Sequence, residues 1–544
     1  MGFLDIIVVV AYLIAVVGLG CWSGLNRNAN SQTLDPGSAK GYFLAGRELR
    51  WPIIGMALFS TNISTVHLVG LAQAGYETGF LMGNFELLAI IPLIMLALFF
   101  APFYIRSRVV TLPDFLEQRY SRRSRDVFAV VSVLSAIFVH IGFSLFTGAV
   151  VLNGIFEMNL PMAASILTVA ALTGLYTILG GLTAVVVTES VQTIVLLAGA
   201  FTITLFAWMR VDGWEGIAAH VPAEHLTLLR SSGAAGDLPW YSFALGYPVI
   251  GIWYWCTDQT IVQRVLGARD ENHARTGALF AGFLKLLPLF IFVLPGVICY
   301  ALVKQGAIGA AQVSDSSNVY ATLIRELLPT GLKGLVAAAL LAAIMSTVSG
   351  ALNSIGTLVS YDLVQRLRPN ISDRALVSVG RWSSFLSLIL AILWSLTLHS
   401  ESIFQSVNAM ITYIAPPITC VFLFGVFWRR ASSTAAAVTL GVGSAAGMLL
   451  FLLGHFEVAW WMDGVKRLRL DFLMIGVLLF GMSSAVMIAL SLWKPHVHTP
   501  QSAELVWKSA WEPLTSPGWP GVGNYKILTF VLLGSSAAIY WLFS

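Results

Sequence analysis

The chain has 544 residues, of which 57% are hydrophobic and only 11% are charged, and its formal net charge is +4. Soluble domains carry about 25% charged residues, so this composition excludes a water-soluble globular protein and indicates that lipid is the main solvent. The four cysteines all lie in apolar segments, which favours buried thiols over a disulfide framework.

Apolar runs long enough to cross a bilayer, about 20 residues each, recur along the whole chain. Fourteen such runs are predicted, at 4–23, 51–75, 79–105, 127–156, 161–180, 184–208, 241–264, 275–304, 334–362, 373–398, 402–427, 433–454, 472–492 and 525–543. The first run has neither a basic start nor an A-x-A cleavage site, which favours a retained helix over a signal peptide. Because the number of runs is even, both termini are expected on one side of the membrane.

The orientation of the helices follows from the basic residues. Alternate connections hold 21 of the 31 Lys and Arg residues, the opposite connections hold eight, and two lie within spans. Loops rich in Lys and Arg stay in the cytoplasm. Both termini are therefore predicted to be extracytoplasmic.

The connection 209–240 divides the chain into two blocks of five spans each. An odd number of spans per block inverts the second block relative to the first, an arrangement common among secondary transporters. The stretches between spans are too short to bury the core of a soluble domain. The predicted organisation is an extra helix and cytoplasmic loop at 1–50, a first inverted repeat at 51–210, an extracellular loop at 211–240, a second repeat at 241–430, and three peripheral helices at 431–544.

The stretch 58–86 places many polar residues inside apolar segments. Ser60, Ser64 and His67 lie in the second run, and Glu86 lies about seven residues into the third. Hydrocarbon offers such groups no partner, so they are expected to face protein or water. His67 and Glu86 are candidates for a solute site, although a packed histidine and a structural hydrogen bond between helices are the alternatives.

Further ionisable residues lie in later spans. Lys285 is about ten residues from either end of its run, too deep to reach the interface easily, and is a candidate for function. Glu189 and Asp258 lie nearer the cytoplasmic ends of their runs. Each of these carboxylates could instead reach water or pair with an arginine such as Arg264.

A second polar cluster, which contains Ser346, Thr347 and Ser349, lies in the run 334–362. Consecutive hydroxyls suit a hard cation that takes oxygen ligands, especially beside carbonyls freed by an unwound helix. Small residues are also the ordinary residues of close helix packing, so the cluster alone leaves both interpretations open.

Consecutive aromatic residues at 253–255 precede Asp258. Membrane interfaces also use Trp and Tyr, but rings with polar edges suit a sugar, whose C–H faces stack while its hydroxyls form hydrogen bonds. The sequence contains no nucleotide-binding loop, metal-ligand cluster or nucleophile triad. This argues against a primary pump and an enzyme, and nothing suggests a nucleic-acid partner.

Five short motifs resemble the sodium/solute symporter family and, within it, the sodium/glucose cotransporters. The resemblance runs from about Tyr42 to Arg430, and WYWCTDQTIVQR is its most specific part. The motifs are FLAGR (43–47), GGLTAVV (180–186), WYWCTDQTIVQR (253–264), FLKL (283–286) and YIAPPI (413–418). The resemblance implies an all-α membrane protein with a LeuT-like core of two inverted five-helix repeats, one helix before the core and three after it.

The resemblance also implies roles for individual residues. A sugar site would comprise His67, Glu86, Tyr254, Trp255, Lys285 and Asn408. Tyr254 would form the inner gate, with Phe85 and Phe404 on the outer side. A sodium site would comprise the carbonyls of Ser60, Ile63 and Ala343 and the hydroxyls of Ser346 and Thr347.

Departures from the family pattern bear on solute and stoichiometry. Asn408 stands in place of a glutamine, which puts the preferred sugar in question. Glu189 stands in place of an aspartate beside a candidate second cation site that would include Ser349, and Gly350 lacks the hydroxyl expected there. One sodium per sugar is therefore expected. The cysteine-rich outer loop of the animal members is missing, which favours a bacterial inner-membrane protein.

The expected function is Na⁺-coupled import of a sugar such as glucose or galactose by alternating access. Alternatives are the same mechanism with myo-inositol or a sialic acid, and proton coupling through Glu86 or Glu189. A sensor is disfavoured because the sequence ends just after its last span.

Overall fold

Helices make up almost all the regular structure in the computed structural model, which describes residues 2–30, 38–156, 161–230, 238–398, 403–468, 470–495 and 498–544. Among these residues the only β-type contact is an isolated parallel bridge between Leu49 and Ala268. The bridge joins the segment just before the first helix of one predicted repeat to the segment just after the first helix of the other.

The first part of the chain runs to a long helical segment that ends at Arg210. Its elements are α1 (Phe3–Asn30), α2 (Ala39–Leu44), η1 (Ala45–Arg47), α3 (Trp51–Asn62), η2 (Val66–Gly70), α4 (Leu71–Thr78), η3 (Gly79–Gly83), α5 (Asn84–Leu88), α6 (Ile90–Met95), η4 (Leu96–Phe100), α7 (Ala101–Arg106), α8 (Leu112–Arg119), α9 (Arg122–Ser135), η5 (Ala136–Gly142), α10 (Phe143–Phe156) and α11 (Met162–Arg210).

The second part begins with short helices in the connection after Arg210 and continues to the C-terminal helix. Its main elements are α12 (Gly213–His220), α13 (Trp240–Ile252), η7 (Trp253–Thr257), α14 (Gln259–Leu266), α15 (Glu271–Leu284), η8 (Leu289–Val293), α16 (Leu294–Lys304), α17 (Val319–Leu327), α18 (Leu332–Leu358), η11 (Val359–Val364), α19 (Gln365–Leu367), α20 (Asp373–Ser395), α21 (Ile403–Phe427), α22 (Ser433–His455), α23 (Ala459–Arg467), α24 (Phe472–Trp493), α25 (Pro500–Ala503) and α26 (Tyr525–Leu542).

Eleven helices in the described residues are long and apolar enough to cross a membrane. The number is lower than the fourteen predicted runs for three local reasons. The second and third runs are counted as one helix from Val66 to Arg106, the fifth and sixth are joined in α11, and the seventh is divided into elements too short to count. Each predicted run nevertheless corresponds to helical structure, so the chain is an all-α membrane protein.

Two of the helices are broken in mid-course. Helix α3 ends at Asn62, Ile63 is extended (φ −75°, ψ 117°), and helical structure resumes as the π-helix η2. In the other half, the π-helix η7 ends at Thr257, and Asp258 is extended (φ −83°, ψ 125°) before α14 begins. Broken helices leave backbone groups unpaired, which a membrane protein tolerates only beside protein or a cavity.

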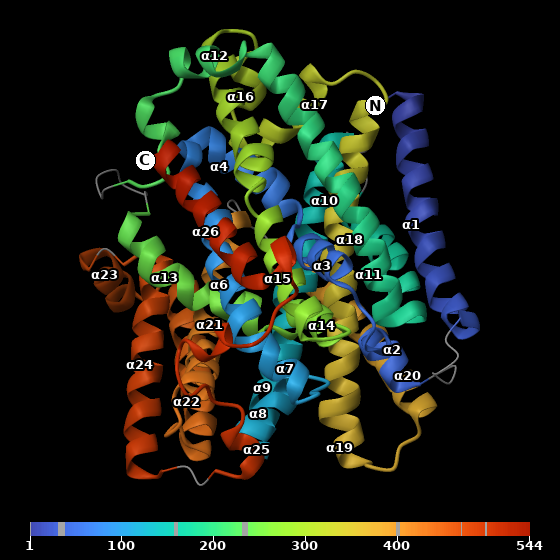
Figure 1. Cartoon of the computed structure of the whole chain (residues 1–544). Helices are drawn as coiled ribbons and strands as arrows, with labels where there is room; N and C mark the ends of the chain where they lie inside the picture. Colours follow the sequence, from blue (N-terminus) through green and yellow to red (C-terminus); the bar gives the residue numbers. More distant parts are fainter. Residues whose placement is uncertain are drawn as a thin grey trace.

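The core surrounds α18, whose residues are almost all buried. Helices α1, α3, α11 and α20 pack against it. In Figure 1, α1 lies at one edge of the molecule and α22 and α24 lie toward the opposite edge. The two broken segments thus lie next to the most buried helix, which positions the candidate site. The exact repeat boundaries and the direction in which the termini face stay predictions.

Candidate functional site

A cavity of about 110 Å³ lies beside the two helix breaks. A cavity needs about 10–15 Å³ to hold one water, so this cavity has room for several waters or for a small polar solute. The six residues predicted for a sugar site all line it, as does Phe85. Its lining residues are Asn62, Ser64, Val66, His67, Phe85, Glu86, Val139, His140, Phe143, Ser144, Tyr247, Ile250, Gly251, Tyr254, Trp255, Lys285, Thr347, Asn408 and Ile411.

A buried charged pair forms part of the cavity wall. The Lys285 ammonium lies 2.5 Å from Oε2 of Glu86, and both side chains are almost fully buried. Lys285 follows directly after the end of α15, in a short turn that precedes Pro288. Charges in a membrane interior are stable only when paired or hydrated, and this geometry pairs them.

His67 completes this group with a defined tautomer. Its Nδ1 accepts a hydrogen bond from the backbone N–H of Ser64 at 3.2 Å, and a backbone N–H can only donate. Nε2, which lies 3.6 Å from Oε1 of Glu86, therefore carries the proton in the neutral ring. Glu86, Lys285 and His67 together present donors and acceptors to one side of the cavity.

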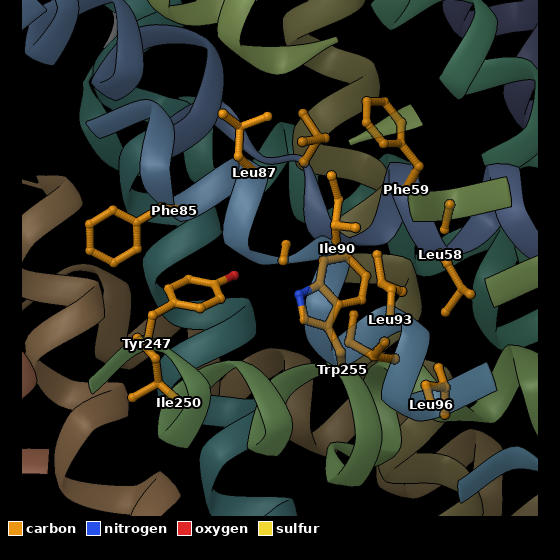
Figure 2. Packing of buried hydrophobic residues seen from close by; sticks show 14 of the residues in the cluster. Leu58, Phe59, Phe85, Leu87, Ile90, Leu93, Leu96, Tyr247, Ile250 and Trp255 are labelled. Atoms are coloured by element: carbon orange, nitrogen blue, oxygen red, sulfur yellow. The ribbon is translucent and has the colours of Figure 1, made fainter. Parts of the chain in front are cut away.

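Aromatic rings provide the apolar part of the wall. The Trp255 ring lies 5.4 Å from the Lys285 ammonium, within the range of a cation–π contact, and 5.2 Å from the Tyr254 ring. Phe85 packs edge-on against Tyr247, with 5.8 Å between ring centres. Figure 2 shows Phe85, Tyr247 and Ile250 on one side of Trp255 within a tightly packed apolar cluster. The side chain of Phe404, the other predicted gate residue, lies outside the described residues.

An oxygen cluster adjoins the cavity where α3 ends against α18. The Ser346 hydroxyl lies 2.8 Å from the carbonyl oxygen of Ser60 and 3.1 Å from that of Ala343. The Thr347 hydroxyl lies 3.1 Å from the carbonyl oxygen of Thr61 and 3.2 Å from that of Ala343. Four of the five residues predicted for a sodium site thus lie together, although Ser60 and Ser346 are 286 positions apart in sequence.

Ile63, the fifth of these residues, is the point at which α3 breaks. Uncharged carbonyl and hydroxyl oxygens are the ligands that a hard monovalent cation takes beside an unwound helix. The donor set of the oxygen cluster therefore fits Na⁺.

Glu189, predicted beside a second cation site, is already paired. Arg264 contacts both of its carboxylate oxygens, at 2.5 Å and 3.3 Å, and Thr61 donates to it at 2.8 Å. A side chain at Gly350 would collide with the Arg264 guanidinium. Ser349 donates to the carbonyl of Ser346 at 3.0 Å. A resident guanidinium, not open space, thus lies against Glu189 and Gly350.

Asp258 is the residue whose partner the sequence did not identify. The structure pairs it with His140, at 3.1 Å between Nε2 and Oδ2, and leaves Arg264 to Glu189. His140 stands in an apolar run, the same signal that drew attention to Lys285. The sequence could not supply its partner, which is 118 positions away.

Comparison with known proteins places the chain in a family. The sequence model of the sodium:solute symporter family matches residues 42–443. The chain is 33% identical over 539 residues to the sodium/glucose cotransporter 4 of Danio rerio, across 92% of this chain and 80% of that protein. It is 34% identical over 484 residues to the sodium/myo-inositol cotransporter 2 of Oryctolagus cuniculus, across 84% and 70% of the two chains.

A solved structure shares the fold. It is described as the substrate-bound outward-open state of a Na⁺-coupled sialic acid symporter, and it matches with a TM-score of 0.77 at 21% identity, over 92% of this chain and all of that one. The family match covers most of the chain, and the relatives are transporters with sodium as the coupled ion. The chain therefore belongs to the sodium:solute symporter family and is a Na⁺-coupled transporter, not an enzyme.

Proposed function

We propose that the protein imports a hexose such as glucose or galactose together with Na⁺ by alternating access. The observation that carries this proposal is the position of Thr347. Its side chain lines the cavity and also belongs to the oxygen cluster, so the solute and the ion would be held on neighbouring sides of one residue.

The cavity suits a polyhydroxylated ring. Glu86 accepts hydrogen bonds, Lys285 donates them, and His67 offers an Nε2–H. Sugar hydroxyls that donate a hydrogen bond and those that accept one therefore both find partners. Trp255 and Tyr254 offer ring faces and edges on which the C–H groups of a sugar can pack. Asn408 lines the same cavity and supplies both an amide donor and an acceptor.

Sodium would bind between the broken α3 and the intact α18 and hold the two helices together. In the structure the hydroxyls of Ser346 and Thr347 lie against carbonyls of α3, and a cation would instead gather these oxygens around itself. If Na⁺ binds more tightly to one conformation of the α3–α18 junction, it also stabilises the shape that the adjoining cavity has in that conformation. By linkage, the sugar then raises the affinity for sodium by the same factor as sodium raises that for sugar.

The proposed stoichiometry is one sodium per sugar. Arg264 already neutralises Glu189 and occupies the space over Gly350, so a second cation there would meet a fixed positive charge. Repulsion between two unit charges about 4 Å apart amounts to several kcal/mol at the effective dielectric of a protein. The same pairing argues against Glu189 as a proton carrier.

We further propose that the protein resides in the plasma membrane with both termini outside, as in a bacterial inner membrane. The proposal is supported by the concentration of basic residues in alternate connections. Protease-cleavable tags at each end should be removed from intact spheroplasts, and tags that stay protected until lysis would reverse the assigned orientation.

The central experiment is uptake of labelled glucose into proteoliposomes with and without an inward sodium gradient. We expect Thr347→Ala to require at least about tenfold more sodium for half-maximal uptake, since it removes one oxygen ligand. Thr202→Ala is a matched control, because the Thr202 hydroxyl donates to the carbonyl of Ala198 in its own helix, in an exposed hydrogen bond. Unchanged sodium dependence in Thr347→Ala would show that the ion binds elsewhere.

Competition by unlabelled solutes separates the alternatives. If myo-inositol or a sialic acid competes with labelled glucose more strongly than any hexose does, that compound is the transported solute and the mechanism stays the same. Uptake that persists in sodium-free buffer under a pH gradient would establish proton coupling instead.

A further inference from the structure

His140 and Asp258 form a second buried pair at the cavity. His140 lies in the π-helix η5 and lines the cavity, and its Nε2 lies 3.1 Å from Oδ2 of Asp258. Both residues are 7% exposed. The His140 ring also lies parallel to Trp253, with 6.2 Å between ring centres, and 6.0 Å from the Tyr254 ring. These contacts fix the ring on three sides.

The pair fixes which nitrogen of His140 carries the proton. Asp258 caps the N-terminus of α14, where its Oδ1 accepts a hydrogen bond from the backbone N–H of Thr260 at 2.7 Å. A carboxylate only accepts hydrogen bonds, so Nε2 of His140 must donate. In the neutral ring, Nδ1 is then an acceptor, and it has no hydrogen-bond partner among the described residues.

We propose that His140, oriented by Asp258, binds a hydroxyl group of the transported solute through Nδ1. This inference rests on the proposed function, because it assigns a further contact within the same cavity. His140 is the specificity-determining residue and Asp258 its positioning residue. Nδ1 accepts a hydrogen bond from the hydroxyl. The contact therefore selects polyols that carry a hydrogen-bond-donating hydroxyl at one defined carbon.

The test compares glucose with its monodeoxy and monodeoxy-fluoro analogues as inhibitors of labelled glucose uptake in proteoliposomes. Fluorine cannot donate a hydrogen bond. For the wild type we expect that, at the carbon whose hydroxyl faces His140, both the deoxy and the fluoro analogue inhibit about tenfold more weakly than glucose, as follows from a buried acceptor left unpaired. In His140→Ala that ratio should fall to about 1, while the ratios at the other carbons persist.

Three further variants separate a binding role from a structural one. His140→Gln retains an amide acceptor and should restore part of the discrimination at that carbon. Asp258→Asn preserves the helix cap but no longer fixes the tautomer, so the same ratio should decrease. His220→Ala, which alters a histidine on α12 in the outer connection, should leave every ratio unchanged.

Several results would overturn the inference. His140→Ala could weaken inhibition by glucose and by all of its analogues by one common factor, which would indicate a structural role. A fluoro analogue that binds like glucose where the deoxy analogue does not would show that His140 donates rather than accepts. If the wild type took up no hexose, the proposed substrate would be wrong, and this result would be distinct from a failure of the role assigned to His140. Myo-inositol and its deoxy derivatives would then test the same ratio for His140.

Discussion

At the scale of single residues, the 2.5 Å contact between Lys285 and Glu86 dominates the cavity. A buried charge whose partner is removed is strongly destabilising, whereas a pair replaced by neutral groups of similar volume is often tolerated. The pair therefore has separable effects on stability and on solute binding. Sequence alone identified both residues, because a charge in an apolar span is rare, but only the structure joins them across 199 positions.

Lys285→Met should lower the free energy of unfolding by about 3–5 kcal/mol, because it leaves Glu86 buried without its cation. The double variant Lys285→Met with Glu86→Gln should recover most of that loss and still lack uptake. Thermal unfolding of the purified protein in detergent, beside uptake in proteoliposomes, checks both parts. A double variant no more stable than Lys285→Met would show that the two residues do not compensate each other.

At the scale of elements, breaks and turns decide where the polar groups lie. Helix α11 contains two of the predicted spans, and its one non-helical residue, Gly181, lies between them with a φ of +60°. A side chain at this position would meet the carbonyl oxygen of Tyr42 at 2.5 Å. The GGLTAVV motif thus contains a glycine with a clear structural reason, which the sequence did not reveal.

Gly181→Ala should destabilise the protein by about 1–3 kcal/mol, through a left-handed backbone and a steric clash. Gly441→Ala is the matched control. Gly441 lies within α22 with open space around it, and alanine there should be neutral or stabilising by up to about 1 kcal/mol. The melting temperatures of the two variants should shift in opposite directions or differ clearly, and equal shifts would contradict the assigned role of Gly181.

At the scale of the whole molecule, the proposed stoichiometry of one sodium per sugar rests on the pairing of Arg264 with Glu189. One sodium carried with a neutral sugar moves one charge per cycle. The membrane potential contributes about 2.3 kcal/mol per charge per 100 mV, which corresponds to about a 50-fold change in accumulation.

Imposing about 100 mV, inside negative, should therefore raise the limiting sugar accumulation by up to about 50-fold at a fixed sodium gradient. A potassium gradient with valinomycin sets the potential, and labelled sugar inside the vesicles is measured at steady state. Sodium activation should be hyperbolic. Sigmoidal activation, or accumulation that rises by the square of this factor, would mean that two sodium ions are carried.

The sequence by itself determined that the chain is an integral membrane protein. It also determined the positions of the helical runs and which polar residues lie too deep in them to be incidental. These follow from local composition, because a span must be apolar and long enough. His67, Glu86 and Lys285 were recognisable for that reason, and the hydroxyls at 346–349 became recognisable through family motifs.

Only the tertiary structure decided which of these groups meet. Polar groups in a membrane interior need partners, but the sequence does not say which of several candidates each will find. Arg264 could have paired with Asp258 or Glu189, and the fold gives it to Glu189 while His140 takes Asp258. Such choices depend on how distant helices pack against α18, and helix packing is a property of the whole chain rather than of any one segment.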